Sequence, residues 1–393
     1  MAARSSIRVD SDDPRRNEMG RRTIVQIVAP GEVGGLESVV LALSAGLMDR
    51  GHRVITAVVS EPRDGQHPFV TALNRAGVTT EEFSVPRRAY LKERALVSEM
   101  CDRIRPDVVH THGYRPDILH AASRWNPSFA TVTTLHGSSR RGGTTTVHEL
   151  IQLALLRRFD AVIAVSRKLA DELRGRWARP DQLHVVPNGL SDHRPPATVE
   201  EARRELGLPS TGLVIGWVGR LIPVKGADVF LRAMARLKGL SMTVSVIGDG
   251  PERATLEAMA RAEGLDDRVR FHGVVADAAR LLSAYDVFVL SSRSEGTPIT
   301  LLEAVAAKVP VVVTSVGGVP DVVGPAEGMV VPPEDPERLA GAIDSVIRNP
   351  AAAAARAEAA TRRLVANFGM ERWMDAHDVV YDLAISSRAK KAR

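Results

Sequence analysis

Short apolar runs alternate along the chain with longer segments whose apolar residues recur at helical spacing. The first run, 23–29, is followed by a glycine-containing loop and by an apolar-periodic segment that stops at Gly51. Runs such as 161–165 have no alternating polar positions, which indicates strands that are buried on both faces. Strands of this kind that alternate with helices predict a parallel sheet covered by helices.

The alternation stops once and then restarts. Residues 191–200, SDHRPPATVE, combine two prolines with mixed charge, which is typical of a linker. The fold class is therefore predicted to be α/β, with two successive doubly wound Rossmann-like domains. The expected divisions are a disordered charged tail, the first domain, the second domain, and a last helix with a basic, solvated tail: 1–20, 21–192, 193–369 and 370–393.

Composition excludes several classes of protein but does not identify the function. Of 393 residues, 44% are hydrophobic and 25% charged, as in globular proteins with well-filled cores. The net charge of +5 is small and aromatic residues are only 4%, so a nucleic-acid surface is not predicted. The single cysteine, Cys101, excludes an intrachain disulfide. Neither a secretory signal nor a run of 18 apolar residues is present, so we expect a cytoplasmic protein.

Unusual residues gather where the strands of the second unit end, which is where open parallel sheets bind ligands. Arg220 and Lys225 follow the run 213–219, and a planar cation beside a point charge suits a diphosphate. Gly248 and Gly250 follow the next strand and would let a base or ribose approach the backbone. A solvated basic loop and an ordinary turn are the alternatives.

Two glutamates stand in the stretch SRSEGTPITLLEAVA, residues 292–306. Thr297 as cap and Pro298 as first helical residue predict that a helix begins there, with its positive dipole end toward the ligand. Glu295 precedes this helix and could accept hydrogen bonds from sugar hydroxyls. Glu303 lies inside the helix, where a ribose diol would supply the donors that a half-buried carboxylate needs. A cap acid and a surface glutamate remain the alternative.

Together these motifs resemble one family. EGTPITLLE matches the Glu-x7-Glu signature of retaining nucleotide-sugar glycosyltransferases of the two-Rossmann-domain (GT-B) type, family 4-like, which include sucrose-phosphate synthases and bacterial mannosyl- and glucosyltransferases. APGEVGGLES, DVVHTHG, VTTLHG, VIAVS, VVPNG, VGRLIPVKG, VIGDGPE and FHG follow the family's order. The resemblance implies a metal-independent enzyme whose first domain binds the acceptor and whose second binds the donor. The last helix would cross back onto the first domain.

The resemblance also implies roles for single residues. In the donor site Arg220 and Lys225 would hold the diphosphate, Glu295 would bind the transferred sugar and Glu303 the ribose. His136 resembles the family's active-site histidine. Backbone groups complete the implied donor site, namely those of Gly34, Gly35, Ile299 and Thr300.

The acceptor side is less well marked. His110 and His112 alternate on one predicted strand and share a face, with Thr111 opposite. A metal site with His136 is disfavoured because no acid stands at a matching strand end. His112 is a candidate for the acceptor side, and so are Arg140 and Arg141 in the loop SSRRGGTTT, for which a plain surface loop is the alternative.

Other functions fit the sequence less well. An epimerase of the same fold is the nearest alternative, and a two-lobed solute-binding protein would not need the set of charged residues. A phosphorylase is not favoured, because no lysine is placed as a pyridoxal anchor. A dehydrogenase is not favoured either, because GEVGG stands where it carries G-x-G-x-x-G. No cofactor is expected besides the nucleotide-sugar substrate. We expect the acceptor to be a glycan, a lipid-linked or a small-molecule hydroxyl. Membrane-associated members of the resembled family use a basic N-terminal face, which would place the protein at the inner face of the plasma membrane. That face would be formed here by Arg87, Arg88, Lys92, Arg94, Arg140 and Arg141, with solvated surface arginines as the alternative.

Overall fold

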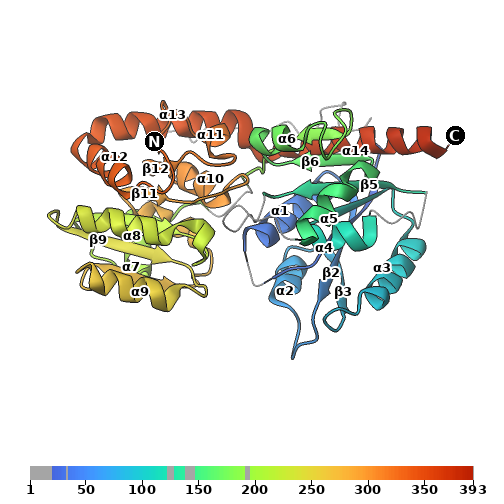
Figure 1. Cartoon of the computed structure of the whole chain (residues 1–393), viewed down its shortest axis with the longest axis horizontal. Coiled ribbons are helices and arrows are strands. Elements are labelled where there is room, and N and C mark those ends of the chain that lie inside the picture. The colour runs from blue at the N-terminus through green and yellow to red at the C-terminus, as the bar shows by residue number, and fades with distance from the viewer. Residues whose placement is uncertain (1–19, 32–33, 122–127, 138–146, 191–194, 393) are drawn as a thin grey trace, which may run out of the picture.

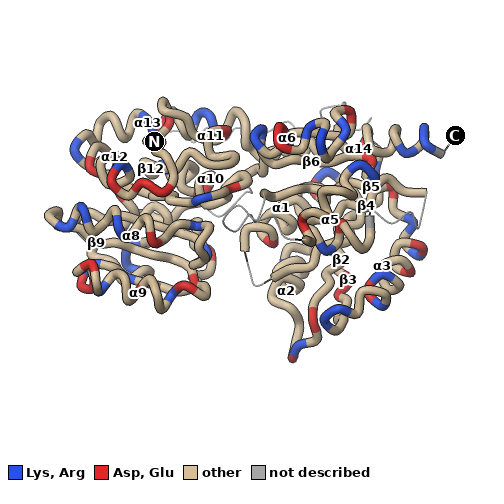
Figure 2. Tube along the Cα trace, in the orientation of Figure 1, with Lys and Arg blue, Asp and Glu red and all other residues tan. Residues whose placement is uncertain are grey.

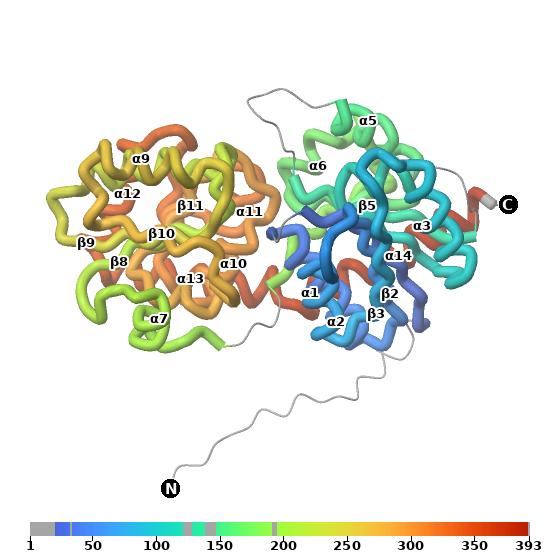
Figure 3. Tube along the Cα trace, turned by 90° about the horizontal axis from the view of Figure 1, so that it is seen from below, coloured from blue at the N-terminus to red at the C-terminus, as the bar shows by residue number. Residues whose placement is uncertain are grey.

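The computed structural model describes residues 20–31, 34–121, 128–137, 147–190 and 195–392. They form two lobes that lie side by side in both views of the chain (Figures 1 and 3). Each lobe contains one sheet, and all strand pairs in both sheets are parallel. The predicted pair of doubly wound α/β domains is confirmed.

The N-terminal sheet has the order β3-β2-β1-β4-β5-β6-β7. Its strands are β1 (Thr23–Val28), β2 (Arg53–Ser60), β3 (Thr79–Ser84), β4 (Val108–His112), β5 (Ala130–Leu135), β6 (Ala161–Ala164) and β7 (Leu183–Val185). The helices of this part of the chain are α1 (Gly35–Asp49), α2 (Pro68–Arg75), α3 (Tyr90–Ile104), α4 (Tyr114–Pro116), α5 (Val147–Leu155) and α6 (Arg167–Leu173).

The C-terminal sheet has the order β10-β9-β8-β11-β12-β13. Its strands are β8 (Leu213–Val218), β9 (Met242–Ile247), β10 (Val269–Gly273), β11 (Val287–Leu290), β12 (Val311–Thr314) and β13 (Met329–Val331). The helices are α7 (Val199–Glu205), α8 (Ala227–Arg236), α9 (Arg253–Ala262), α10 (Ile299–Ala306), α11 (Val319–Val322), α12 (Pro336–Arg348), α13 (Pro350–Phe368) and α14 (Met370–Ala392).

The uniformly apolar runs form the buried strands, as their pattern predicts. β6, β11 and β12 are buried at every position. Figure 2 shows Lys, Arg, Asp and Glu mainly on the helices and loops around the sheets. No helix within the described residues has the length and apolar character needed to cross a membrane.

The last two helices tie the domains together (Figure 1). Leu364 and Phe368 of α13 belong to a core of the C-terminal domain, whereas Trp373 and Tyr381 of α14 belong to a core of the N-terminal domain. The predicted crossing of the final helix is confirmed. The helix is longer than expected: residues 386–392 continue it instead of forming a solvated tail, and Lys391 Nζ lies 2.7 Å from Asp160 Oδ1.

An ion-pair cluster holds α14 against the N-terminal sheet. Asp378, only 1% exposed, bonds Arg22 at 2.8 Å, His52 at 2.9 Å and Arg50 at 3.0 Å. Burial alone would raise the pKa of Asp378, but the hydrogen bonds from His52 and Arg50 and the charge of Arg22 leave that pKa lowered. The carboxylate is therefore held in its charged form by three partners.

Candidate active site at the domain seam

The loop before α10 is one of the places where the two domains touch. The Thr297 hydroxyl donates to the carbonyl oxygen of Val165 in the N-terminal domain, 2.5 Å away. A Cβ on Gly296 would lie 2.2 Å from the carbonyl oxygen of His136, so only glycine allows this approach. The expected cap is thus wrong: Thr297 faces the other domain, and α10 begins at Ile299 without a side-chain cap.

Lys225 and Glu295 meet in this loop region as an ion pair. Lys225 Nζ lies 2.8 Å and 2.9 Å from the two carboxylate oxygens of Glu295. The Ser292 hydroxyl donates to the same carboxylate at 2.6 Å. The lysine side chain is 30% exposed and that of Glu295 only 6%. The sequence assigned these two residues to different parts of a ligand, so any phosphate or sugar hydroxyl that binds one must share or replace this pair.

Arg220 stands on the loop after β8 and is exposed. Within the described part of the chain its guanidinium has no hydrogen bond or ion pair. Arg293, in the loop of Glu295, is instead held by Asp228 at 2.8 Å and by Glu334. Arg220 is therefore a cation with its donors available, on the same strand end as Lys225.

Gly248 and Gly250 have a structural reason to be glycine. A Cβ on Gly248 would lie 1.9 Å from the carbonyl oxygen of Gly219, and one on Gly250 would lie 2.4 Å from that of Leu221. Both have positive φ, 130° and 159°. Their first effect is to press the turn after β9 against the Arg220 loop. The approach of a base or ribose to this turn stays a prediction.

The start of α10 lies against both domains. Ile299 packs on a core of each domain and is half-buried, as are Thr300 and Glu303. In the N-terminal domain, Gly34 directly precedes α1 and Gly35 begins it. A Cβ on Gly35 would meet nothing within 4 Å, so local packing does not require glycine there.

His136 and His112 contact each other at the carboxyl ends of β4 and β5. His136 Nε2 lies 3.2 Å from His112 Nδ1, and His112 Nε2 lies 2.9 Å from Gln26 Oε1. Burial lowers the pKa of His136 to about 4 and that of His112 well below its usual value. Both rings are neutral near pH 7. Within the described residues no group of three or more His, Cys, Asp or Glu is arranged to hold a metal ion.

The expected sharing of a strand face is confirmed. His110 bonds Tyr381 of α14 at 2.9 Å, whereas Thr111 bonds Asp117 on the other side. The Arg140 and Arg141 predictions fall outside the described residues. Sequence reasoning missed Gln26 and Ser292, and no motif marks either of them.

A pocket of about 670 Å³ opens in the N-terminal domain at the ends of β1, β2 and β4. His112 lines it together with Arg63, His67, Tyr114 and Arg115. It lies at the carboxyl ends of the strands, on the same side of the sheet as the pair His112 and His136. It is large enough for one or two sugar rings, by comparison with ordinary ligand sites of roughly 300–1,000 Å³.

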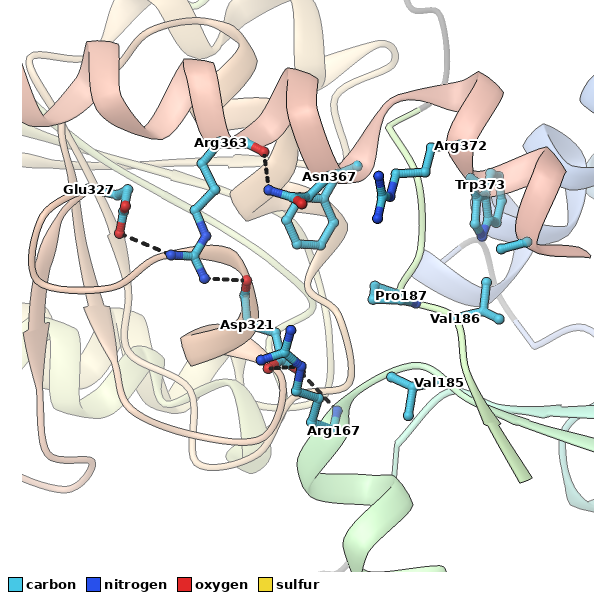
Figure 4. Close-up of a pocket in the computed structure, with 12 residues that line it drawn as sticks. Arg167, Val185, Val186, Pro187, Asp321, Glu327, Arg363, Asn367, Arg372 and Trp373 are labelled. Carbon is cyan, nitrogen blue, oxygen red and sulfur yellow. Dashed lines mark hydrogen bonds and ion pairs between the residues drawn. The ribbon is translucent and has the colours of Figure 1, made fainter. Parts of the chain in front are cut away.

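A second cavity, of about 740 Å³, is lined by the end of α13 and the start of α14 (Figure 4). Arg167, Arg363 and Arg372 line it. Acids partly neutralise two of these three arginines, because Arg167 Nε lies 3.8 Å from Asp321 Oδ1 and Arg363 pairs with Glu327 at 3.4 Å. None of the residues predicted to bind a ligand lines this cavity. Its contacts brace the two domains against each other.

Comparison with known proteins identifies the family of this chain. Residues 33–194 match the model "Glycosyltransferase Family 4" and residues 198–363 the model "Glycosyl transferases group 1". A lipopolysaccharide core biosynthesis mannosyltransferase, LpcC of Rhizobium leguminosarum bv. viciae, is 35% identical over 58% of the chain and 66% of its own length. A glycogen synthase of Mycobacterium tuberculosis is 31% identical over 70% of the chain and 69% of its own length. The first three curated relatives are matched over 58–66% of their own lengths.

Solved structures share the whole fold. Anabaena Alr3699/HepE, solved in complex with UDP-glucose, has a TM-score of 0.80 at 22% identity, over 90% of this chain and 98% of that one. Sucrose-phosphate synthase of Thermosynechococcus elongatus has a TM-score of 0.77 at 23% identity, over 92% and 98%. The fold of the chain is thus the two-domain GT-B fold of these neighbours.

Proposed function

Since the chain belongs to the GT-B glycosyltransferases, with family models matching both of its domains, we propose that it is a retaining enzyme that moves a sugar from a nucleoside diphosphate sugar to an acceptor hydroxyl. The observation that carries this proposal is the boundary between the domains. The Lys225–Glu295 pair and Arg220, whose side chain has no partner among the described residues, follow strand ends of one domain, and the His136–His112 pair lies at strand ends of the other. Solved neighbours bind UDP and UDP-glucose, which supports a nucleotide-sugar donor.

The charged residues of the C-terminal domain would stabilise the leaving diphosphate. As the bond from the anomeric carbon to the phosphate oxygen breaks, negative charge grows on the diphosphate. Arg220 and Lys225 and the amides of Ile299 and Thr300 at the start of α10 would receive that charge. Fixed donors of this kind contribute about 3–4 kcal/mol each in enzymes where one has been removed. With cations and a helix end in place, the proposed reaction needs no metal ion.

Glu295 would orient the transferred sugar through its hydroxyls, and Lys225 would exchange part of its contact with Glu295 for the phosphate. Glu303 would bind the ribose, with Gly34 and Gly35 across the seam from the diphosphate. Retention would follow if the acceptor enters on the face that the phosphate leaves. A phosphate oxygen then takes the proton of the acceptor hydroxyl as the new glycosidic bond forms.

The acceptor would bind in the N-terminal pocket lined by His112. Next to that pocket are large apolar side chains that face solvent: Leu91 is 84% exposed, Tyr114 50% and Val147 69%. Ring contacts connect this region, since Arg115 lies over Tyr90 and Tyr114 lies 5.6 Å from the ring of His148. This apolar rim lies near the exposed basic residues Arg87, Arg88, Lys92 and Arg94. The combination supports peripheral contact with a membrane surface and a lipid-linked acceptor.

A thermal-shift panel of UDP, GDP, ADP and dTDP tests the donor class. A nucleotide at a hundredfold excess over its Kd adds about 2.7 kcal/mol of stability to the folded protein. Incubation with the matching nucleotide sugars then separates a transferase, which releases free sugar slowly or glycosylates an added acceptor, from an epimerase, which returns an isomer. Absence of any nucleotide effect, or formation of an isomer, would contradict the proposal.

A further inference from the structure

A continuous chain of hydrogen bonds connects His136 to helix α1 through three buried side chains. It runs from His136 to His112, from His112 to Gln26 and from Gln26 to Ser44, over 3.2, 2.9 and 3.1 Å. Gln26, Ser44 and His112 are each at most 1% exposed. A ring nitrogen donates or accepts according to the tautomer, so distances alone leave the direction of these bonds open.

Ser44 fixes the direction at one end. Its hydroxyl lies 2.7 Å from the carbonyl oxygen of Val40, which can only accept. With its proton used there, the Ser44 oxygen accepts from its two other neighbours, Gln26 Nε2 and the hydroxyl of Thr56, both at 3.1 Å. The Gln26 amide is thereby assigned: its nitrogen faces Ser44 and its oxygen faces His112.

The remaining protons follow in order. Gln26 Oε1 accepts, so His112 carries its proton on Nε2. Because burial keeps the ring neutral, His112 Nδ1 has a lone pair and accepts from Nε2–H of His136. His136 is neutral for the same reason. One proton per ring leaves a lone pair on His136 Nδ1.

That lone pair has no visible partner. His136 Nδ1 is buried and has no hydrogen bond to any of the described residues. An unsatisfied buried acceptor costs a protein free energy, so its presence calls for an explanation, and a bound ligand that donates to it is one. His136 directly follows β5, its backbone carbonyl lies against Gly296, and Gly137 after it lies against the backbone of Glu295, so the residue stands beside the place where the proposed sugar would lie.

We propose that Gln26 and His112 are positioning residues that hold His136 with its proton on Nε2, so that Nδ1 accepts a hydrogen bond from a substrate hydroxyl. The identity of the hydroxyl rests on the proposed function. The tautomer does not, because it follows from the bond chain that ends at Val40. No covalent bond is made or broken at His136 in this role.

Nitrogen NMR of protein labelled with ¹⁵N in histidine tests the tautomer directly, because protonated and unprotonated ring nitrogens differ widely in chemical shift. The His136 signals are identified by their loss in His136→Asn. We expect a protonated Nε2 and an unprotonated Nδ1 in both His136 and His112. A His136 ring with its proton on Nδ1 would overturn the inference, whatever the activity of the protein.

Addition of donor tests the hydroxyl. The nucleotide sugar that the thermal-shift panel selects should move the Nδ1 resonance of His136, and the nucleotide alone should move it less. If saturation with donor and then with an accepting glycoside leaves Nδ1 unchanged, the hydroxyl contact is contradicted. Absence of any sugar turnover in the unmodified protein would instead contradict the proposed function and leave the tautomer result intact.

Variants separate positioning from packing. Gln26→Met removes the acceptor for His112 at similar side-chain length and should give a mixture of His136 tautomers and a roughly tenfold lower kcat. Gln26→Glu keeps an oxygen acceptor and should restore the tautomer. Tyr381→Phe is the matched control, because it removes a buried hydroxyl that bonds His110. Neither Tyr381 nor His110 belongs to the series of hydrogen bonds that runs from His136 to Ser44.

Equal loss of kcat in Gln26→Met and Tyr381→Phe with an unchanged His136 tautomer would reduce Gln26 to a packing residue and refute the inference. If Gln26→Met fails to fold, Ser44→Ala takes its place. It frees the Gln26 amide to turn over and should produce the same mixture of tautomers.

Discussion

The two domains share one architecture and use their polar residues in opposite ways. Each sheet is built outward from its first strand, with its second and third strands on one side and the rest on the other. In the N-terminal domain the strand ends carry buried neutral rings, His112 and His136, while the charged cluster at Asp378 serves to dock α14. In the C-terminal domain the strand ends carry the charges themselves, Lys225, Arg220 and Glu295.

This difference indicates which kind of ligand group each domain suits. Neutral rings with fixed tautomers recognise hydroxyl groups through hydrogen bonds, whereas unpaired or exchangeable cations recognise phosphate. We therefore expect buried charge in the first domain to govern stability and charge at the seam of the second to govern binding and turnover. The predictions below test that division.

The largest expected effect is on stability, at Asp378. Asp378→Ala leaves Arg22, Arg50 and His52 without their shared carboxylate. Breaking a buried ion pair from one side costs about 3–5 kcal/mol, so the midpoint of urea unfolding should fall clearly while the nucleotide Kd stays unchanged. The matched control is Asp375→Ala, since Asp375 pairs with Arg50 at 2.6 Å but is 64% exposed, and should cost little.

Lys225→Met should do the reverse. Loss of a fixed cation at the leaving group should lower turnover of the nucleotide sugar by about 10²–10³-fold, with a smaller change in the melting temperature. Lys238→Ala, an exposed lysine after α8, is the control and should keep full turnover. A Lys225→Met enzyme with ordinary turnover would move the diphosphate away from this residue.

Acid should act first on the N-terminal domain. The folded pKa of His136 and of His377 is about 4, lowered chiefly by burial. The unfolded chain takes up those protons near pH 6.5, so stability is lost as pH falls from about 6.5 to about 4. Asp117, whose pKa burial raises to about 6, has the opposite sign and offsets part of the loss.

We expect a net loss on the order of 3 kcal/mol at pH 4 relative to pH 7. Hydrogen exchange measured at both pH values should show that β4 and β5 lose protection before β8 and β9. Earlier opening of the C-terminal sheet would reverse the comparison between the domains.

The smallest effect is expected for Arg220→Ala. The side chain has no hydrogen bond or ion pair among the described residues to lose, so unfolding should be unaffected. Loss of charged hydrogen bonds to a diphosphate should weaken nucleotide binding by about 1.5–3 kcal/mol, which is roughly tenfold or more in Kd. Arg270→Ala, an exposed arginine on β10, is the control for calorimetric titrations and should leave Kd unchanged.

Much of the fold was predictable because it depends on local pattern. Apolar runs such as 161–165 specify buried strands, and the proline-rich linker marks the division between sheets. The place of Arg220 and Lys225 at the end of β8 follows from the same pattern. The contacts of these residues do not, because the pairing of Lys225 with Glu295 joins positions 70 apart and depends on which strands are neighbours.

Two further features lay beyond sequence reasoning for the same reason. Thr297 has the residue type and position of a helix cap, but contact with Val165 in the other domain takes its hydroxyl. Gln26 looks like an ordinary polar residue within a strand, and only the approach of β1 to β4 gives it His112 as a partner. In both cases long-range packing decides what a locally ordinary side chain does.

Calorimetric titration of the unmodified protein and of the double variant Arg220→Ala/Lys225→Met with the four nucleoside diphosphates tests the central claim most directly. We predict that one diphosphate binds the unmodified protein, that its nucleoside binds much more weakly, and that the double variant no longer distinguishes the two. Undiminished preference of the double variant for the diphosphate would contradict the account.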